Sequence, residues 1–377
     1  MKIALVVPGG VDRSGVDRVV PALLWQIERL ARLHSVHVFA LAQEPEPAHW
    51  DLLGASVHNV GPTRGRHWRF QSWFAAEHRV ARFDLIHAFW AGMATYAAPA
   101  ALRAGIPYIV HLAGGELVAL DDIGYGGCCT LRGRVVLRAS LAAARGVSAP
   151  SGYMLAQAHA HGCAAREIPL GVALDRWPVT PPRQRDESRP ARLLHIGDLR
   201  PVKDQGLLLH AAARLRDQHA DFTLDIAGFD TLGGEMQRLA TQLQLDSIVQ
   251  WHGVLRRDRL RALVDTSDLL VVTSRHDAGP LVVLEAAIAG VPTIGTAVGH
   301  IADWAPVGAA IAAPNDAKEL ASLIAALLAD EQRRLAIARE AQRRAVAIDA
   351  DYTSMCFERM YTEVIGARRL QLSPTYT

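Results

Sequence analysis

The sequence predicts an α/β protein with two Rossmann-like domains. Short β-branched runs alternate with longer amphipathic stretches, as expected when crossover helices connect parallel strands. The chain has 377 residues, more than the roughly 100–200 that one hydrophobic core usually serves. The rhythm breaks at Trp177–Ala191, which is rich in proline and charge and has a linker composition. We therefore expect domains at 1–178 and 190–350, followed by a C-terminal helix in 351–377 that crosses back to the first domain.

Five strands are predicted in the first domain. They are Ile3–Pro8, Val36–Leu41, Asp84–Phe89, Pro107–Leu112 and Gly146–Pro150. Between the first two, Val16–Leu33 has apolar residues at helical spacing. The apolar stretch at the N-terminus is too short for a signal peptide and runs into the turn Pro8-Gly9-Gly10, so it is interpreted as the first strand.

The second domain repeats this pattern. Its predicted strands are Arg192–Gly197, Phe222–Ala227, Ile248–His252, Leu269–Ser274 and Pro292–Thr296. Helical stretches such as Asp204–His219 and Asp316–Leu328 separate them. The last helix is predicted from about Thr353 to Arg368, and residues 372–377 are expected to fray.

Composition excludes several classes of protein. Lys and Arg total 40 against 38 Asp and Glu, a balance that argues against a nucleic-acid-binding protein. Four cysteines, two of them the adjacent Cys128 and Cys129, make no disulfide framework and fit a reducing cytoplasm. No apolar run reaches the roughly 20 residues of a membrane span. We expect a cytoplasmic protein.

The most informative segment is Ser274–Pro292, which predicts the order strand, turn, helix, turn, strand. Pro280 suits the first turn of a helix, and Gly290 suits its C-terminal cap. The amides of Leu281 and Val282 would then be unpaired. A helix N-terminus that follows the carboxyl end of a strand is a ready site for a diphosphate.

Two acids flank this helix start. Glu285 lies about one turn into the helix, where a carboxylate can accept hydrogen bonds from ribose hydroxyls. Asp277, in the preceding loop, can reach a sugar. Spacing alone leaves an alternative open, in which Glu285 is a helix-surface acid and Asp277 a turn residue.

An acid, seven residues and a glutamate, followed by Ala-Ala, Gly and Pro, resemble the E-x7-E motif of glycosyltransferase family 4. Further motifs occur in the family's order: Gly9-Gly10, Gly15–Arg18, Asp84–Ala88, Ile106-Pro107 leading to His111, Ile168–Val172, Asp175–Trp177 and His195–Asp204. The resemblance implies the GT-B fold, with two Rossmann-like domains facing each other across a cleft. The first domain would bind the acceptor, and the second would bind a UDP-, GDP- or ADP-sugar, with no tightly bound cofactor.

The resemblance also implies residue roles. The donor-binding set would be Gly9, Gly10, Arg200, Lys203, Gly279, Leu281, Val282 and Glu285, and the catalytic set His111, Lys203 and Asp277. Lys203 and the helix amides would contact the diphosphate, Glu285 the ribose, and Asp277 and His111 the transferred sugar. The family's retaining reaction is usually drawn without a protein nucleophile, so stabilisation of the leaving diphosphate is the main catalytic term.

Two departures keep other functions open. Asp277 stands where the family more often has Glu, and Asp198 replaces a basic residue, whose charge Arg200 could supply. The alternatives are an inactive nucleotide- or carbohydrate-binding relative, and a nucleotide-sugar epimerase of the same fold. Gly9 and Gly10 would let the backbone approach a ligand, or form a plain tight turn. His111 alone could equally be a core histidine.

No metal site is expected. Asp349-Ala350-Asp351 matches a D-x-D pattern but lies far from any strand edge, so capping or linker roles are expected. His159 and His161 are two residues apart and would point to different faces of a helix. The basic and aromatic stretch Arg64–Phe74 could touch an anionic membrane, which would suit a lipid-linked acceptor, or form a packed helix with a solvated arginine face.

Overall fold

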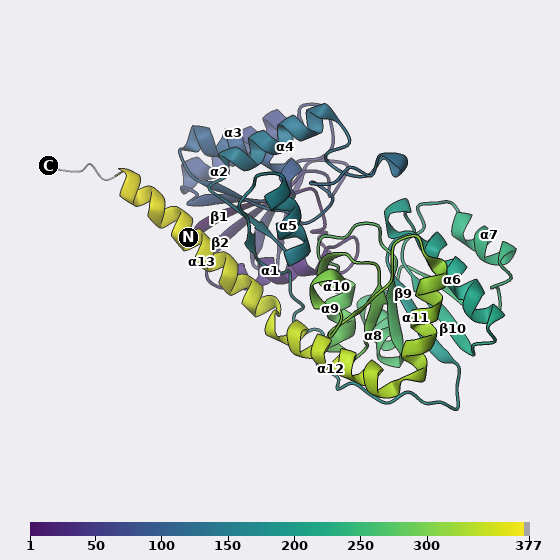
Figure 1. The fold of residues 1–377 in the computed structure, drawn as a ribbon. Coiled ribbons are helices and arrows are strands. Elements are labelled where there is room, and N and C mark those ends of the chain that lie inside the picture. Colours follow the sequence, from purple (N-terminus) through teal and green to yellow (C-terminus); the bar gives the residue numbers. More distant parts are fainter. Residues whose placement is uncertain (373–377) are drawn as a thin grey trace. The chain divides into compact units, whose positions relative to one another are not determined.

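The computed structural model describes residues 1–372, with side chains up to residue 367 (Figure 1). The chain forms two compact units: one contains Met1–Gly171 and the helix that starts at Ala350, and the other contains Val172–Asp349. Each unit is built around a largely parallel sheet covered by helices, which confirms the predicted α/β class. The fraying predicted for 372–377 falls almost wholly outside the described residues.

Unit 1 has an eight-stranded sheet in the order β3-β4-β2-β1-β5-β6-β7-β8. Its strands are β1 (Lys2–Val7), β2 (Ser35–Ala40), β3 (Ala48–Leu52), β4 (Ala55–Asn59), β5 (Leu85–Phe89), β6 (Tyr108–His111), β7 (Gly146–Ala149) and β8 (Arg166–Glu167). All five predicted strands are present. The antiparallel β3–β4 hairpin was not predicted; it turns at Gly54, whose φ of 82° suits a residue without a side chain.

Six α-helices surround this sheet in the described residues. They are α1 (Pro21–Ala31), α2 (Arg66–Val80), α3 (Ala94–Ala104), α4 (Leu131–Ala143), α5 (Gly152–Ala160) and α13 (Ala350–Leu372). Helix α1 begins later than predicted, because Pro21 occupies its first turn and Arg18 has a φ of 50°.

The C-terminal helix α13, yellow in Figure 1, packs against α1 within unit 1. Phe357, Met360 and Tyr361 are buried in the core that the two helices share with the sheet. The helix starts at Ala350 rather than near Thr353, so Asp351 lies in its first turn, where its carboxylate accepts a hydrogen bond from Arg29 Nε at 2.5 Å.

Unit 2 has a six-stranded parallel sheet in the order β11-β10-β9-β12-β13-β14. Its strands are β9 (Ala191–Ile196), β10 (Phe222–Ala227), β11 (Val249–Gly253), β12 (Leu269–Val272), β13 (Thr293–Gly295) and β14 (Ala310–Ile311). Its helices are η3 (Pro201–Lys203), α6 (Gln205–Asp217), α7 (Glu235–Gln242), α8 (Arg257–Thr266), α9 (Leu281–Ile288), α10 (Gly299–Trp304), α11 (Ala317–Ala329) and α12 (Glu331–Ala347). All five predicted strands are again present.

The proline-rich segment expected to be a linker lies within unit 2 and is fastened to it. The fully buried carboxylate of Asp268 accepts hydrogen bonds from Arg189 (3.1 Å), Arg183 (3.4 Å) and the amide of Arg192 (2.9 Å). The segment therefore packs against unit 2 although its composition is typical of a linker. Its arginines neutralise the Asp268 carboxylate, which would be unfavourable as a buried, unpaired charge.

The order of the strands locates the functional edge of this sheet. From β9 the chain builds outward through β10 and β11, then returns to place β12 on the other side of β9. Ligands of such sheets bind outside the carboxyl ends of the strands at this reversal. The loops after β9 and β12 are therefore the first place to look for a site.

Within the part of the chain that is described, no helix is both long enough and apolar enough to cross a lipid bilayer.

Candidate functional site

The loop after β9 is held tightly. Asp198 accepts a hydrogen bond from the amide of Phe229 at 3.1 Å. A Cβ on Gly228 would lie 2.0 Å from the carbonyl oxygen of Gly197, so only glycine fits where the two loops meet. Asp204 then turns the chain with a φ of 45° and caps α6 by accepting from the amide of Leu207.

This loop is tied to the loop after β12. Thr273 Oγ1 donates to the carbonyl oxygen of Lys203 at 2.9 Å. The amide of Arg275 donates to the carbonyl oxygen of Val202 at 2.8 Å. These bonds bring Lys203 Nζ to 2.5 Å from Asp277 Oδ2. Two predicted site residues, 74 positions apart in the sequence, therefore form an ion pair at the sheet reversal.

Helix α9 begins directly after this pair. Pro280 is its N-cap rather than part of its first turn, so the helix begins at Leu281. Gly290, predicted as the C-terminal cap, follows the end of the helix with a left-handed φ of 74°. In residues 1–372, the amides of Leu281 and Val282 donate to no protein acceptor. Gly279 is half-buried beside them. The N-terminus of α9 thus offers free donors a few residues after Asp277, the ion-pair partner of Lys203.

In the described part of the chain, two buried polar atoms in or beside the loop that contains Asp277 have no hydrogen-bond partner. They are Ser274 Oγ and His300 Nε2. Helix α10, which carries His300, packs so closely that a Cβ on Gly299 would lie 3.1 Å from the carbonyl oxygen of Asp277. Such atoms are rare in folded proteins, and a bound molecule could supply their hydrogen-bond partners.

Glu285 is almost completely buried, with 3% of its surface exposed, so the alternative of a helix-surface acid is wrong. Its Oε1 lies 3.1 Å from an Arg257 guanidinium nitrogen, and its backbone carbonyl accepts a hydrogen bond from Trp177 Nε1 at 2.8 Å. Burial raises the pKa of Glu285 to about 7, although the positive charge of Arg257 acts in the opposite direction.

Sequence reasoning missed three residues around this acid and loop. Arg257 and Trp177 come from distant segments, and no local motif marks either as a neighbour of Glu285. The Arg257 guanidinium lies over the Trp177 ring, 5.0 Å from its centroid. His300 had a weak signal, because the sequence Gly299-His300 follows the carboxyl end of β13.

Arg200, predicted to bind phosphate, is exposed at the N-cap of η3. Its position three residues before Lys203 gives the same loop a second cation.

The predicted residues of unit 1 have structural roles of their own. The amides of Gly10 and Val11 donate to Gln43 Oε1 at 2.6 and 2.9 Å. A Cβ on Gly10 would lie 2.6 Å from Val20 Cγ2, so the tight turn itself requires glycine there. The neighbouring Gly9 also faces Gln43, whose Oε1 would be 3.3 Å from an added Cβ.

His111 is the last residue of β6 and is fully buried. Its Nδ1 lies 2.9 Å from Ser148 Oγ, and its ring contacts Phe89 and Phe357. Burial lowers the pKa of His111 to about 3, so the imidazole is neutral at neutral pH. Its Nε2 has no hydrogen-bond partner among the described residues.

Solved structures of other proteins share this fold. Sucrose-phosphate synthase from Thermosynechococcus elongatus superposes with a TM-score of 0.82 at 19% identity, over 97% of this chain and 100% of that one. HepE from Anabaena, solved with UDP-glucose, superposes with a TM-score of 0.75 at 18% identity, over 96% of this chain and 100% of that one. The chain therefore has the GT-B fold of these proteins.

Family models cover most of the sequence. Residues 180–344 match the family described as glycosyl transferases group 1, and residues 19–171 match the glycosyl transferase 4-like domain. The chain belongs to the group 1 glycosyltransferases, which confirms the predicted family. Glycogen synthase from Mycobacterium tuberculosis is 32% identical over 175 residues, which are 45% of this chain and 42% of that relative. The match thus spans less than half the length of this curated relative.

Proposed function

We propose that the protein is a retaining glycosyltransferase that moves a sugar from a nucleotide-diphosphate sugar to an acceptor hydroxyl. The observation that carries the proposal is the Lys203–Asp277 pair at the sheet reversal, next to the free amides that begin α9. A cation, unpaired amide donors and a carboxylate within one loop cluster suit a ligand that joins a diphosphate to a sugar.

In this proposal the diphosphate binds to Lys203, Arg200 and the amides of Leu281 and Val282, with Gly279 allowing close approach. Lys203 is one of three lysines in a chain whose cations are otherwise arginines. A lysine acts as a compact point charge that can exchange partners, so its ammonium group can leave Asp277 when a phosphate arrives. Asp277 is then free to accept a hydrogen bond from the sugar.

Glu285 would accept hydrogen bonds from the ribose hydroxyls. Its burial removes water as a competitor, and Arg257 at 3.1 Å favours the ionised carboxylate that accepts such bonds best. Asp198, the other departure from the family pattern, is engaged with the amide of Phe229. We therefore assign it a role in holding the loop rather than in binding phosphate.

We propose that the leaving diphosphate itself assists the acceptor hydroxyl, with no protein nucleophile and no metal ion. When the glycosidic bond breaks, negative charge grows on the β-phosphate, and Lys203, Arg200 and the α9 amides stabilise that charge. We propose that His111 of unit 1, a neutral imidazole whose Nε2 has no partner among the described residues, contacts the transferred sugar. Gly9 and Gly10 of unit 1 are proposed to let the backbone approach the donor.

The acceptor would be a glycan, a small molecule or a lipid-linked saccharide. Contact with an anionic membrane is proposed for Arg64–Phe74. In this stretch Trp68 is 76% exposed, while Phe70 and Phe74 face the core. Co-sedimentation with anionic vesicles, absent with neutral vesicles and lost in Trp68→Ala, would support this contact; equal recovery with and without vesicles would reject it.

The donor proposal is tested by thermal-shift measurements with UDP-, GDP- and ADP-sugars, each without and with a divalent cation. We expect one base series to raise the melting temperature without metal, because the ligand binds only the folded state. Lys203→Gln should lose this shift, and the exposed Lys318→Gln should keep it. No shift with any donor would favour an inactive relative, and a changed sugar on the free nucleotide without acceptor would favour an epimerase.

A further inference from the structure

Two histidines lie on one face of the unit 1 sheet. His37 is on β2 and His58 on β4, and the parallel register pairs Phe39 with His58. Because side chains two residues apart on a strand share a face, His37, Phe39 and His58 point the same way. The antiparallel hairpin adds His49 of β3 directly opposite His58.

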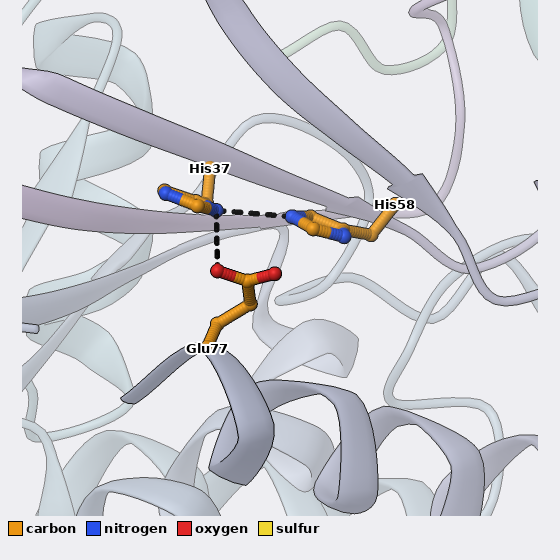
Figure 2. Close-up of side chains that lie close together, drawn as sticks. All are labelled: His37, His58 and Glu77. Carbon is orange, nitrogen blue, oxygen red and sulfur yellow. Dashed lines mark hydrogen bonds and ion pairs between the residues drawn. The ribbon is translucent and has the colours of Figure 1, made fainter. Parts of the chain in front are cut away.

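Helix α2 covers this face and completes the cluster. Glu77 on α2 reaches His37, with Oε2 at 3.6 Å from Nδ1. His37 Nδ1 is in turn 3.0 Å from His58 Nε2. Figure 2 shows the two imidazoles side by side on their strands, with the carboxylate rising from the helix toward them. One ligand atom from each of the three residues lies within 4.8 Å of the other two.

We propose that His37, His58 and Glu77 bind a divalent transition-metal ion of the zinc type. Two imidazole nitrogens and one carboxylate oxygen are a ligand set that suits zinc and cobalt better than magnesium or calcium. A tetrahedral ion with bonds of about 2.1 Å requires ligand atoms about 3.4 Å apart, close to the 3.0 and 3.6 Å found here. The fourth position would be taken by water.

Hydrogen bonds do not join all three residues of this cluster. His37 Nδ1 carries at most one proton, which can go to His58 Nε2 but not at the same time to Glu77, and 3.6 Å is too long for a hydrogen bond to the carboxylate. A cation between the three atoms would use a lone pair from each of them.

His49 supplies the supporting contact that such sites usually have. Its Nδ1 lies 3.0 Å from His58 Nδ1, and its ring contacts Trp73. When His58 donates its Nδ1 proton to His49, the lone pair of His58 is on Nε2, the atom that faces His37 and Glu77.

The positive charge of Lys2 lies beside the proposed metal site. Its Nζ donates to the backbone carbonyl of Glu77 at 2.8 Å, lies 3.6 Å from Glu77 Oε2 and sits over the ring of Phe83. This ammonium group competes for the carboxylate and repels a second cation. It should weaken metal binding without preventing it, and its removal should strengthen binding.

The experiment uses the full chain, freed of any purification tag and treated with a chelator. Co²⁺ is titrated while its visible absorption bands are followed, and Zn²⁺ is titrated calorimetrically. The variants are His37→Gln, Glu77→Gln, His49→Gln and Lys2→Met, and the control is His67→Gln, which changes an exposed histidine on the same helix.

We expect one equivalent of Co²⁺ with the intense bands of tetrahedral coordination, displaced by Zn²⁺. His37→Gln and Glu77→Gln should abolish this site, and His49→Gln should weaken it about tenfold. Lys2→Met should tighten it, which damage to the fold could not do. The proposal is overturned if the wild type binds no Co²⁺, or if His37→Gln and Glu77→Gln bind as well as His67→Gln.

Discussion

Glu285→Gln should remove a pH dependence that burial of this carboxyl gives to the stability of unit 2. The carboxyl is 3% exposed and its one described ionic partner is Arg257. Its pKa is about 7 in the folded protein against a reference value of 4.5. Between these values the folded state holds more protons than the unfolded state, so stability is greatest at low pH and falls as pH rises toward 7.

The size of the effect follows from the shift in pKa. Each unit corresponds to about 1.4 kcal/mol, so the rise from 4.5 to about 7 corresponds to about 3 kcal/mol lost between pH 4 and pH 8. For a domain of this size, 1 kcal/mol moves the melting temperature by roughly 2–4 °C. The melting temperature of the wild type relative to Glu285→Gln should therefore fall by roughly 6–12 °C over this range.

Differential scanning calorimetry of both proteins from pH 4 to pH 8 measures this difference. Loss of the Arg257 partner in the variant adds an offset that does not change over this range, so only the slope is diagnostic. Arg257→Gln should extend the wild-type dependence to higher pH, because it removes the charge that favours the ionised carboxylate. Parallel curves for the wild type and Glu285→Gln would show that the carboxyl titrates normally and would refute the reasoning.

Three further substitutions probe the packing. Gly290→Ala should lower the free energy of unfolding, measured in urea, by at least about 2 kcal/mol more than Gly233→Ala does. Both glycines have positive φ, but only at Gly290 would a Cβ meet backbone, at 2.6 Å from Pro182 N. Equal losses would contradict this. Phe357→Ala should destabilise unit 1 by about 3–5 kcal/mol, since the ring is fully buried, and a loss below 1 kcal/mol would show that α13 is not part of that core. Trp177→Phe should cost about 1 kcal/mol by removing the hydrogen bond to the Glu285 carbonyl, and an unchanged urea midpoint would count against that contact.

The strands that could be predicted from the sequence are those with apolar side chains on both faces of the sheet. The central strands of both sheets are mostly apolar and buried, as in Ile3–Val7 and Leu269–Val272, because helices cover both faces of each sheet. The β3–β4 hairpin was missed because β3, with the sequence Ala-His-Trp-Asp-Leu, is a short, half-exposed edge strand. Polarity and shortness remove the pattern on which strand prediction depends.

Site residues could be predicted where they belong to one local motif. Lys203 and Asp277 each follow a strand, and the sheet order explains why they meet. Arg257 and Trp177 reach Glu285 only through tertiary packing, which leaves no spacing to read. The same holds for His37, His58 and Glu77, whose convergence depends on a strand register that the sequence does not display.

Isothermal titration of the best-stabilising nucleotide sugar into Lys203→Gln, with Lys318→Gln as the matched control, tests the central claim most directly. Loss of one charged contact to phosphate costs about 1.5–3 kcal/mol, so Lys203→Gln should bind roughly 10- to 100-fold more weakly while Lys318→Gln binds as the wild type does. Equal affinity for all three proteins would contradict a donor site built on the loop after β9.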